Sequence, residues 1–246
     1  MNYKALFATL AVALPIGATL AASGFLADYS KLKPVTTASG TDQVYTAPGA
    51  LERLAAYSAV MIDEPEIHFS AASEYKGMKP EDVLALSTFM RNAIKTELES
   101  GGYVVVDKPA GNALYVRSAL TELYLKKKKR KLLQYTPIGF VTKAGMDALK
   151  DTLDKVDIIE VTLEAELKDS TSGELLSELV AARGARKAED QKEQRMDLDT
   201  FAATIGEYSS RLRCRLDNSK LPQAQWIDCT DAAARSARTG KTGKTN

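Results

Sequence analysis

The stretch that decides the fold is KPEDVLALSTFMRNAIKTELESGGYVVV, from Lys79 to Val106. Pro80 suits the first position of a helix, and the two acidic residues after it lie at the positive end of the helix dipole. The apolar residues that follow recur at intervals of three and four: Val83, Leu86, Met90, Ala93, Ile94 and Leu98. Gly101–Gly102 can take the positive φ that ends a helix. The stretch therefore predicts a helix over Glu81–Ser100 that leads into a strand over Tyr103–Val106.

Further strands are predicted on both sides of this unit. Tyr57–Ile62 is a strand candidate, which Ile67–Phe69 extends beyond Pro65. The run Ala113–Leu125 is the longest strand candidate, and its apolar content favours a central position in the sheet.

A hairpin is predicted after residue 158. In Ile159–Lys168, apolar residues alternate with Glu160, Thr162, Glu164 and Glu166, which predicts one buried and one solvent-exposed face. The turn Asp169–Gly173 then leads to Leu175–Ala182 as the antiparallel partner.

A second helix is predicted over Thr200–Leu216, capped by Asp197 or Asp199. Its apolar stripe consists of Phe201, Ile205, Tyr208, Leu212 and Leu216. With the strands, this predicts an α+β fold: a two-layer sandwich with a four- or five-stranded, mainly antiparallel sheet and two principal helices on one face. Residues 50–230 are expected to form this single domain.

The segments outside this domain are predicted to lack regular structure. Residues 23–49 form an N-terminal arm and linker, because Val35–Gly49 is rich in Thr, Ser, Gly and Ala. Residues 231–246 are expected to be a disordered tail, since Arg235–Asn246 has almost nothing to bury.

The first 22 residues have the parts of a secretory signal peptide. Lys4 precedes an apolar run over Ala5–Leu14, which Pro15 interrupts before the roughly 20 residues that a membrane span needs. We expect cleavage near residue 22 and a periplasmic protein. Loss of Lys4 lowers the formal charge from +1 to 0, so no overall charge favours nucleic acid or an acidic partner.

The sequence contains two cysteines, Cys214 and Cys229. In an oxidising compartment such a pair predicts a disulfide, whose 15-residue loop would stabilise the fold by about 3 kcal/mol. These cysteines and the single histidine, His68, are too few for a zinc site, so no metal or other cofactor is expected.

The expected mature chain opens with Gly24-Phe-Leu-Ala-Asp-Tyr-Ser-Lys-Leu-Lys-Pro34. This opening is similar to that of an uncharacterised family of bacterial envelope lipoproteins, a domain of unknown function whose mature chains begin Gly-Phe-Leu-x-Asp-Tyr-Ser-x-Leu-x-Pro. The resemblance implies an envelope location but no activity and no catalytic residue. Family members usually carry a lipidated Cys just before the motif. Ser23 cannot carry the thioether lipid, so no lipid anchor is expected here.

Apolar side chains gather in this opening segment. Phe25, Leu26 and Tyr29 lie within a segment too short to bury them unaided. Two hypotheses follow: the arm docks on the domain's own surface, which tied-down arms commonly do, or these three residues bind a partner, an unknown envelope protein. The sequence leaves open whether the protein is an oligomer.

Six consecutive cations follow the central strand: Lys126, Lys127, Lys128, Lys129, Arg130 and Lys131. They cannot be buried together, so they are expected at an exposed turn or strand end. Apolar residues between Leu132 and Val141 come next, and the two together could contact anionic lipid or lipopolysaccharide. The alternative is a solubilising hairpin tip.

Sequence signals for catalysis are weak. The chain has no glycine-rich phosphate loop, no nucleophile elbow and no His-Glu-x-x-His motif. Asp63, Glu64 and Glu66 could act as acid and base or as calcium ligands, but adjacent strand residues point to opposite faces, which favours a solvated strand end. We therefore expect a non-catalytic binding or assembly module of the envelope. The alternatives are a lipid-surface protein and an envelope hydrolase.

Overall fold

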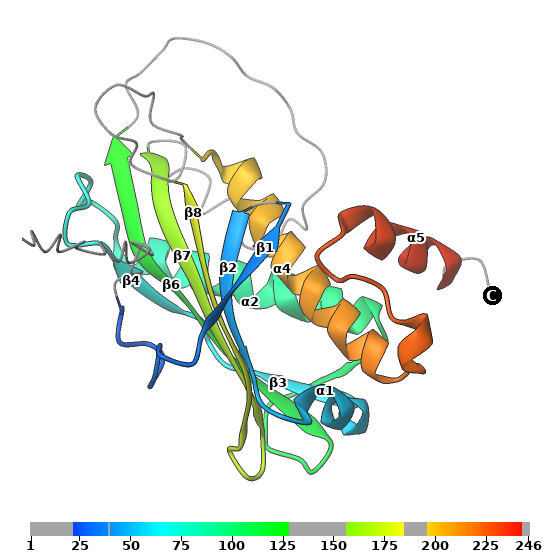
Figure 1. Cartoon of the computed structure of the whole chain (residues 1–246). Helices are drawn as coiled ribbons and strands as arrows, with labels where there is room; N and C mark the ends of the chain where they lie inside the picture. Colours follow the sequence, from blue (N-terminus) through cyan, green and yellow to red (C-terminus); the bar gives the residue numbers. More distant parts are fainter. Residues whose placement is uncertain (1–21, 39, 128–155, 185–195, 243–246) are drawn as a thin grey trace, which may run out of the picture.

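The computed structural model describes residues 22–38, 40–127, 156–184 and 196–242 (Figure 1). Within these residues an eight-stranded mixed sheet has the order β1-β2-β8-β7-β6-β3-β5, with β4 beside β6. The strands are β1 (Lys33–Thr37), β2 (Gly40–Thr46), β3 (Ala59–Ile62), β4 (Glu66–Phe69), β5 (Val104–Val106), β6 (Ala113–Lys127), β7 (Val156–Asp169) and β8 (Leu175–Gly184). The predicted four or five strands were too few.

The strand directions divide the sheet into two parts. Along the order β1-β2-β8-β7-β6, neighbouring strands are antiparallel, and of these pairs the hairpin of β7 and β8 was predicted. The strands β3, β4 and β5 pair in parallel, β3 and β4 with β6 and β5 with β3. Between β3 and β5 the chain passes through β4 and then α2, and this crossover through a helix allows β5 to pair with β3 in parallel.

Four α-helices lie in the described residues: α1 (Ala50–Arg53), α2 (Pro80–Ser100), α4 (Leu198–Ser219) and α5 (Ala232–Thr242). The two principal helices of the sequence analysis, α2 and α4, are confirmed. Pro80 begins α2, Asp82 Oδ2 accepts a hydrogen bond from the Lys79 amide at 3.2 Å, and Gly102 takes the expected positive φ of 83° after the helix. Asp197 caps α4 by accepting from the Thr200 amide at 2.8 Å.

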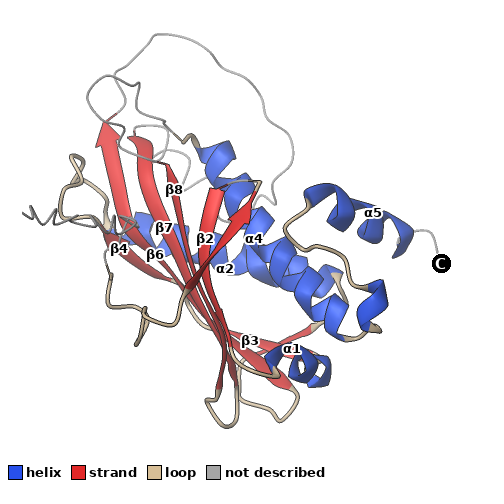
Figure 2. Ribbon diagram, in the orientation of Figure 1, coloured by secondary structure: helices blue, strands red, loops and turns tan. Residues whose placement is uncertain are grey.

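The helices α2 and α4 lie on one side of the sheet (Figure 2), and the main core is made by side chains of the sheet and of these two helices. Leu114, Val116 and Leu120 of β6 face this core, and Ala119 faces the opposite side. A bulge after Thr121, where Glu122 has a φ of 51°, changes the alternation, so that Leu123 and Leu125 face the core again. The bulge explains why both odd and even positions of this strand are apolar.

The segment Val35–Gly49, predicted to be a flexible linker, instead contains strands. β1 and β2 form a hairpin around Gly40, whose φ is 133°, and β2 pairs with β8. The prediction was wrong because composition hid the β-branched residues of this segment, which suit a strand once a neighbouring edge supplies hydrogen bonds. The backbone of this linker is therefore part of the sheet.

The predicted disordered tail is also corrected, because α5 covers most of it. The Arg235 guanidinium is buried and donates to the Cys229 carbonyl at 2.7 Å, and Arg238 donates to Asn218 Oδ1 at 2.5 Å. The Cys214–Cys229 disulfide is present and ties the segment before α5 to α4. Long arginine side chains thus supply contacts that an apolar count misses.

Candidate functional site

The N-terminal arm lies on the face of the sheet opposite the helices. Phe25 and Leu26 are 5% and 3% exposed and pack with Ala119 of β6 and Val180 of β8. This is the arrangement that the docking hypothesis for the arm predicts. Partner binding by Phe25, Leu26 and Tyr29 stays a prediction, and it would require the arm to leave the sheet.

Tyr29 connects the arm to a buried carboxylate. Its hydroxyl donates to Glu164 Oε2 at 2.7 Å and lies 2.8 Å from Ser23 Oγ, while Thr121 Oγ1 donates to Glu164 Oε1 at 2.6 Å. Burial, together with the hydrogen bond to Glu164, raises the pKa of Tyr29. Both oxygens of Glu164 are therefore engaged, one by Tyr29 of the arm and the other by Thr121 of β6.

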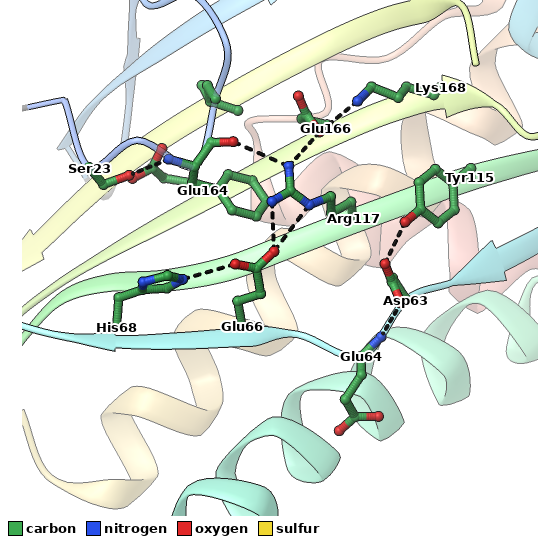
Figure 3. Close-up of polar contacts among 12 residues, drawn as sticks. Ser23, Asp63, Glu64, Glu66, His68, Tyr115, Arg117, Glu164, Glu166 and Lys168 are labelled. Atoms are coloured by element: carbon green, nitrogen blue, oxygen red, sulfur yellow. Dashed lines mark hydrogen bonds and ion pairs between the residues drawn. The ribbon is translucent and has the colours of Figure 1, made fainter.

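Arg117, on β6, is the centre of the same surface (Figure 3). Its guanidinium donates to Glu66 Oε1 at 2.7 Å, to Glu166 Oε2 at 3.1 Å and to the Phe25 carbonyl at 3.2 Å. It also lies 4.0 Å from the centroid of the Phe25 ring, within the range of a cation–π contact. We call Arg117, Glu66, Glu164, Glu166 and Tyr29 the arm clasp.

The clasp overturns one prediction for β7. Glu164 and Glu166 were expected on a solvent-exposed face, but they are 1% and 3% exposed. Alternation correctly separates the two faces of the strand. Alternation cannot show that the arm covers the polar face. It also cannot show that Arg117 and Lys168 compensate the charge of this face, where Lys168 donates to Glu166 at 2.8 Å.

The other carboxylates near the clasp do not converge. Asp63 accepts from the Tyr115 hydroxyl, whereas Glu64 accepts from Ser87 Oγ at 2.7 Å on the helix side (Figure 3). His68 is exposed, and its Nε2 lies 3.0 Å from Glu66 Oε2. In the described ranges no group of three or more His, Cys, Asp or Glu side chains could hold a metal ion.

A second polar network lies on the helix side of the sheet and was missed by the sequence analysis. Asp42 of β2 is fully buried and accepts from Arg183 Nη2 at 2.5 Å and from the Tyr208 hydroxyl at 2.9 Å. Arg211 Nη2 of α4 lies 2.8 Å from the other oxygen of Asp42. These residues are far apart in sequence, so no spacing could have revealed the network.

A cavity of about 70 Å³ adjoins this network between α4 and strands β6, β7 and β8. Its apolar wall includes Met90, Ile94, Leu163, Ile205 and Leu212. Arg211, Arg215 and Ser118 also line it. Apolar walls with a few polar side chains are typical of a small-molecule site, but a volume of about 70 Å³ is well below the roughly 300–1,000 Å³ of most ligand pockets and admits only a very small ligand. The arm clasp, by contrast, is closed by the chain itself.

The basic run lies mostly outside the described residues. Lys126 Nζ is 3.3 Å from Glu74 Oε1, and Lys127 is exposed at the end of β6. Lys128–Lys131 and the apolar residues up to Val141 are not described, so anionic-surface binding stays a prediction. No helix in the described parts is long and apolar enough to cross a membrane.

A family model described as "Protein of unknown function (DUF3313)" matches residues 21–212. The chain belongs to this family. The match includes the arm, the sheet and most of α4, so the arm belongs to the DUF3313 domain. The family description assigns no function, and no curated protein matches the sequence.

Solved structures similar to this DUF3313 chain are distant. A PelC dodecamer from Paraburkholderia phytofirmans is 15% identical with a TM-score of 0.36, covering 68% of this chain and 95% of that one. A minor lipoprotein from Acinetobacter baumannii is 14% identical with a TM-score of 0.29, covering 68% and 97%. At this level of similarity neither protein indicates a function for this chain.

A substitution of Glu178 tests how strongly the buried acidic surface around the arm clasp disfavours negative charge. Glu178 lies on β8, directly opposite Glu166 of β7. It is 2% exposed, and its Oε2 has no hydrogen-bond partner among the described residues. Burial and the nearby Glu166 raise its pKa above the ordinary value of 4.5. The folded state therefore disfavours the charged form, and Glu178→Gln is expected to stabilise the protein by about 1 kcal/mol at pH 7.

The gain should disappear as the pH falls below 4.5, where Glu178 is protonated in both the folded and the unfolded states. Urea denaturation at pH 7 and pH 4 measures the difference. Destabilisation at pH 7 would show that the Glu178 carboxylate is stabilised by a contact outside the described residues.

Proposed function

We propose that the protein is an exported, envelope-associated binding module that holds a ligand without transforming it. The observation that carries this proposal is the cavity beneath α4, which combines apolar walls with Arg211, Arg215 and Ser118. Arg211 Nη1 and Ser118 Oγ have no hydrogen-bond partner among the described residues. Such a site can bind and orient a molecule.

A catalytic role has less support from the geometry. The arm clasp brings three carboxylates together, and they are engaged by Arg117, Tyr29, Thr121 and Lys168. An acid–base pair needs a free group within reach of a substrate, and the docked arm covers this surface. The clasp therefore serves to fix the arm.

The proposed location rests on two features of the chain. Residues 1–22 have the pattern of a secretory signal, and Cys214 and Cys229 form a disulfide, which is typical of oxidising compartments. With Ser23 in place of a lipidated cysteine, the mature protein is proposed to be periplasmic and free of a lipid anchor.

Cell fractionation combined with native and denaturing mass spectrometry tests the proposal. We expect a periplasmic chain that begins near Ser23, and a native mass that exceeds the denatured mass by a bound molecule. A chain that keeps residues 1–22 in the cytoplasm would overturn the location. A periplasmic chain that turns over an envelope substrate would overturn the binding role.

A further inference from the structure

A hollow of about 160 Å³ lies beside Arg215, among α1, α4 and the strands β2, β7 and β8. We call it the α1 hollow. We propose that it binds a small monocarboxylate whose apolar body is about the size of one benzene ring, with the carboxylate at Arg215. This inference rests on the proposed binding function, and it names the class of ligand and the place of the ligand's body.

The walls of the α1 hollow are apolar. They come from α1, the turn after it and the strands β7 and β8, and consist of Ala50, Leu51, Leu54, Leu167 and Leu176. Four of these residues are at most 8% exposed, whereas Leu51 is 37% exposed. The hollow therefore has a buried apolar floor, and a ligand in it would also remove the exposed surface of Leu51 from water.

The volume of the α1 hollow sets the size of the ligand. A dry cavity of about 150 Å³ can hold one benzene molecule, so about 160 Å³ is enough for a single ring. The cavity beneath α4, at about 70 Å³, is too small for such a ring. Leu51 and Arg215 also line a neighbouring hollow of about 200 Å³, which leaves room for a carboxylate next to the guanidinium.

Arg215 is the charged residue in the described lining of the α1 hollow. It makes no hydrogen bond or ion pair with any described residue, and it is only partly buried, so its donors can reach a ligand. The other two polar residues of the lining are Ser177, whose hydroxyl donates to the Tyr45 carbonyl at 2.8 Å, and the exposed Thr46. A planar guanidinium fork without a partner matches the two oxygens of a carboxylate.

The buried charges near Arg215 leave its own charge uncompensated. Asp42 is already shared by Arg183 and Arg211, at 2.5 and 2.8 Å. Glu178 lines the cavity beneath α4 together with Arg215, but it does not line the α1 hollow, and its raised pKa disfavours the charged form. Burial and the neighbouring Arg211 lower the pKa of Arg215 although Asp42 opposes them. An added anion would therefore be stabilising.

Asp228 is the remaining carboxylate near Arg215, and it lines the 200 Å³ hollow. Its Oδ1 accepts from the Thr230 amide at 2.8 Å and from the Thr230 hydroxyl at 2.7 Å, and the residue is exposed. It forms no ion pair with Arg215. The α1 hollow, which Asp228 does not line, is therefore the side of Arg215 where an apolar carboxylate meets one cation and no described anion.

The test uses the mature chain, stripped of bound molecules, and benzoate as the probe. Calorimetry and the fluorescence of Trp226, the single tryptophan, which lines the 200 Å³ hollow beside Arg215, report binding. We expect one benzoate per chain. Benzyl alcohol, which lacks the charge, and acetate, which lacks the ring, should each bind at least tenfold more weakly. Equal binding of benzoate and benzyl alcohol would overturn the role of Arg215.

Three variants locate the site. Arg215→Gln is expected to weaken benzoate about tenfold and to leave benzyl alcohol unchanged. Leu51→Ala removes part of the apolar wall and should weaken both probes about fivefold, and because Leu51 is partly exposed the fold should persist. Arg213→Gln is the matched control, since Arg213 lies on the same helix but pairs with Glu97 and Asp217, and it should bind benzoate normally.

Benzoate binding that neither Arg215→Gln nor Leu51→Ala weakens would place the ligand elsewhere and overturn the inference. The absence of any benzoate binding by the original chain would do the same. In either case, a different molecule released from the periplasmic protein would leave the proposed binding function standing. Identical native and denatured masses, together with no benzoate binding, would remove both.

Discussion

Asp42→Asn is expected to lower the free energy of unfolding by about 3–5 kcal/mol. Asp42 is fully buried and compensates Arg183 and Arg211, whose nearest guanidinium nitrogens lie 2.5 and 2.8 Å from its oxygens. An asparagine would leave both cations without a counter-charge and would turn an amide donor or an uncharged oxygen toward them. Urea denaturation, followed by circular dichroism, measures the loss.

Asp107→Asn is the matched control for this change. The Asp107 side chain is 90% exposed and lies 3.7 Å from Arg91, so its loss should cost less than about 1 kcal/mol. A double-mutant cycle adds a second check, because Arg211→Met should cost less in the Asp42→Asn background than in the original chain. A loss below 1 kcal/mol for Asp42→Asn would contradict the assignment of a buried network.

Arg117→Met is expected to destabilise the protein by about 3 kcal/mol and to release the arm. The change removes the ion pair to buried Glu166, the hydrogen bond to the Phe25 carbonyl and the cation–π contact with the Phe25 ring. Lys168 would remain as a partner of Glu166, which limits the loss. Denaturation measures stability, and hydrogen exchange over residues 23–32 measures docking of the arm.

The pH dependence of the Arg117→Met effect follows from Glu66. Burial raises the pKa of Glu66, but hydrogen bonds from His68 and Arg117 outweigh this, so its pKa lies below the ordinary 4.5. The stabilisation from this pair is therefore complete above pH 4.5 and is lost as the pH falls through the lowered pKa. The difference between the original chain and the variant should shrink accordingly in acid.

Arg53→Met is the control for loss of an arginine. Its partner Glu174 lies 2.5 Å away, but the two side chains are 37% and 58% exposed, so water screens the pair and the loss of stability should be much smaller than for Arg117→Met. If Arg117→Met cost no more than Arg53→Met and the arm stayed protected, the clasp would not be what holds the arm.

The long helices and strands were predictable because their patterns are local. Pro80, Gly102 and the spacing of apolar residues between them determine α2 without reference to the rest of the chain. The strands β6, β7 and β8 contain enough apolar residues to be recognised in the same way. The linker and the tail were misjudged because β1, β2 and α5 are stabilised by neighbours rather than by their own composition.

The candidate sites were likewise predictable only where the signal is local. Phe25, Leu26 and Tyr29 could be identified as residues that must be covered, but only the structure shows that the chain's own sheet covers them. The cavity residues could not be identified at all. Ser118, Arg211 and Arg215 have ordinary positions in a strand and a helix, and their meaning depends on the gap between the two.

The sequence by itself determined which segments become the long helices and the three long strands, and which cysteines pair. Periodicity and loop length act within one segment or between two positions, so they can be read from the chain. Only the tertiary structure decided that Glu164 and Glu166 are buried and that Asp42 forms ion pairs with two arginines. It also decided that a cavity remains between α4 and the sheet. Burial and charge compensation depend on residues far apart in sequence, and these meet only when the layers pack.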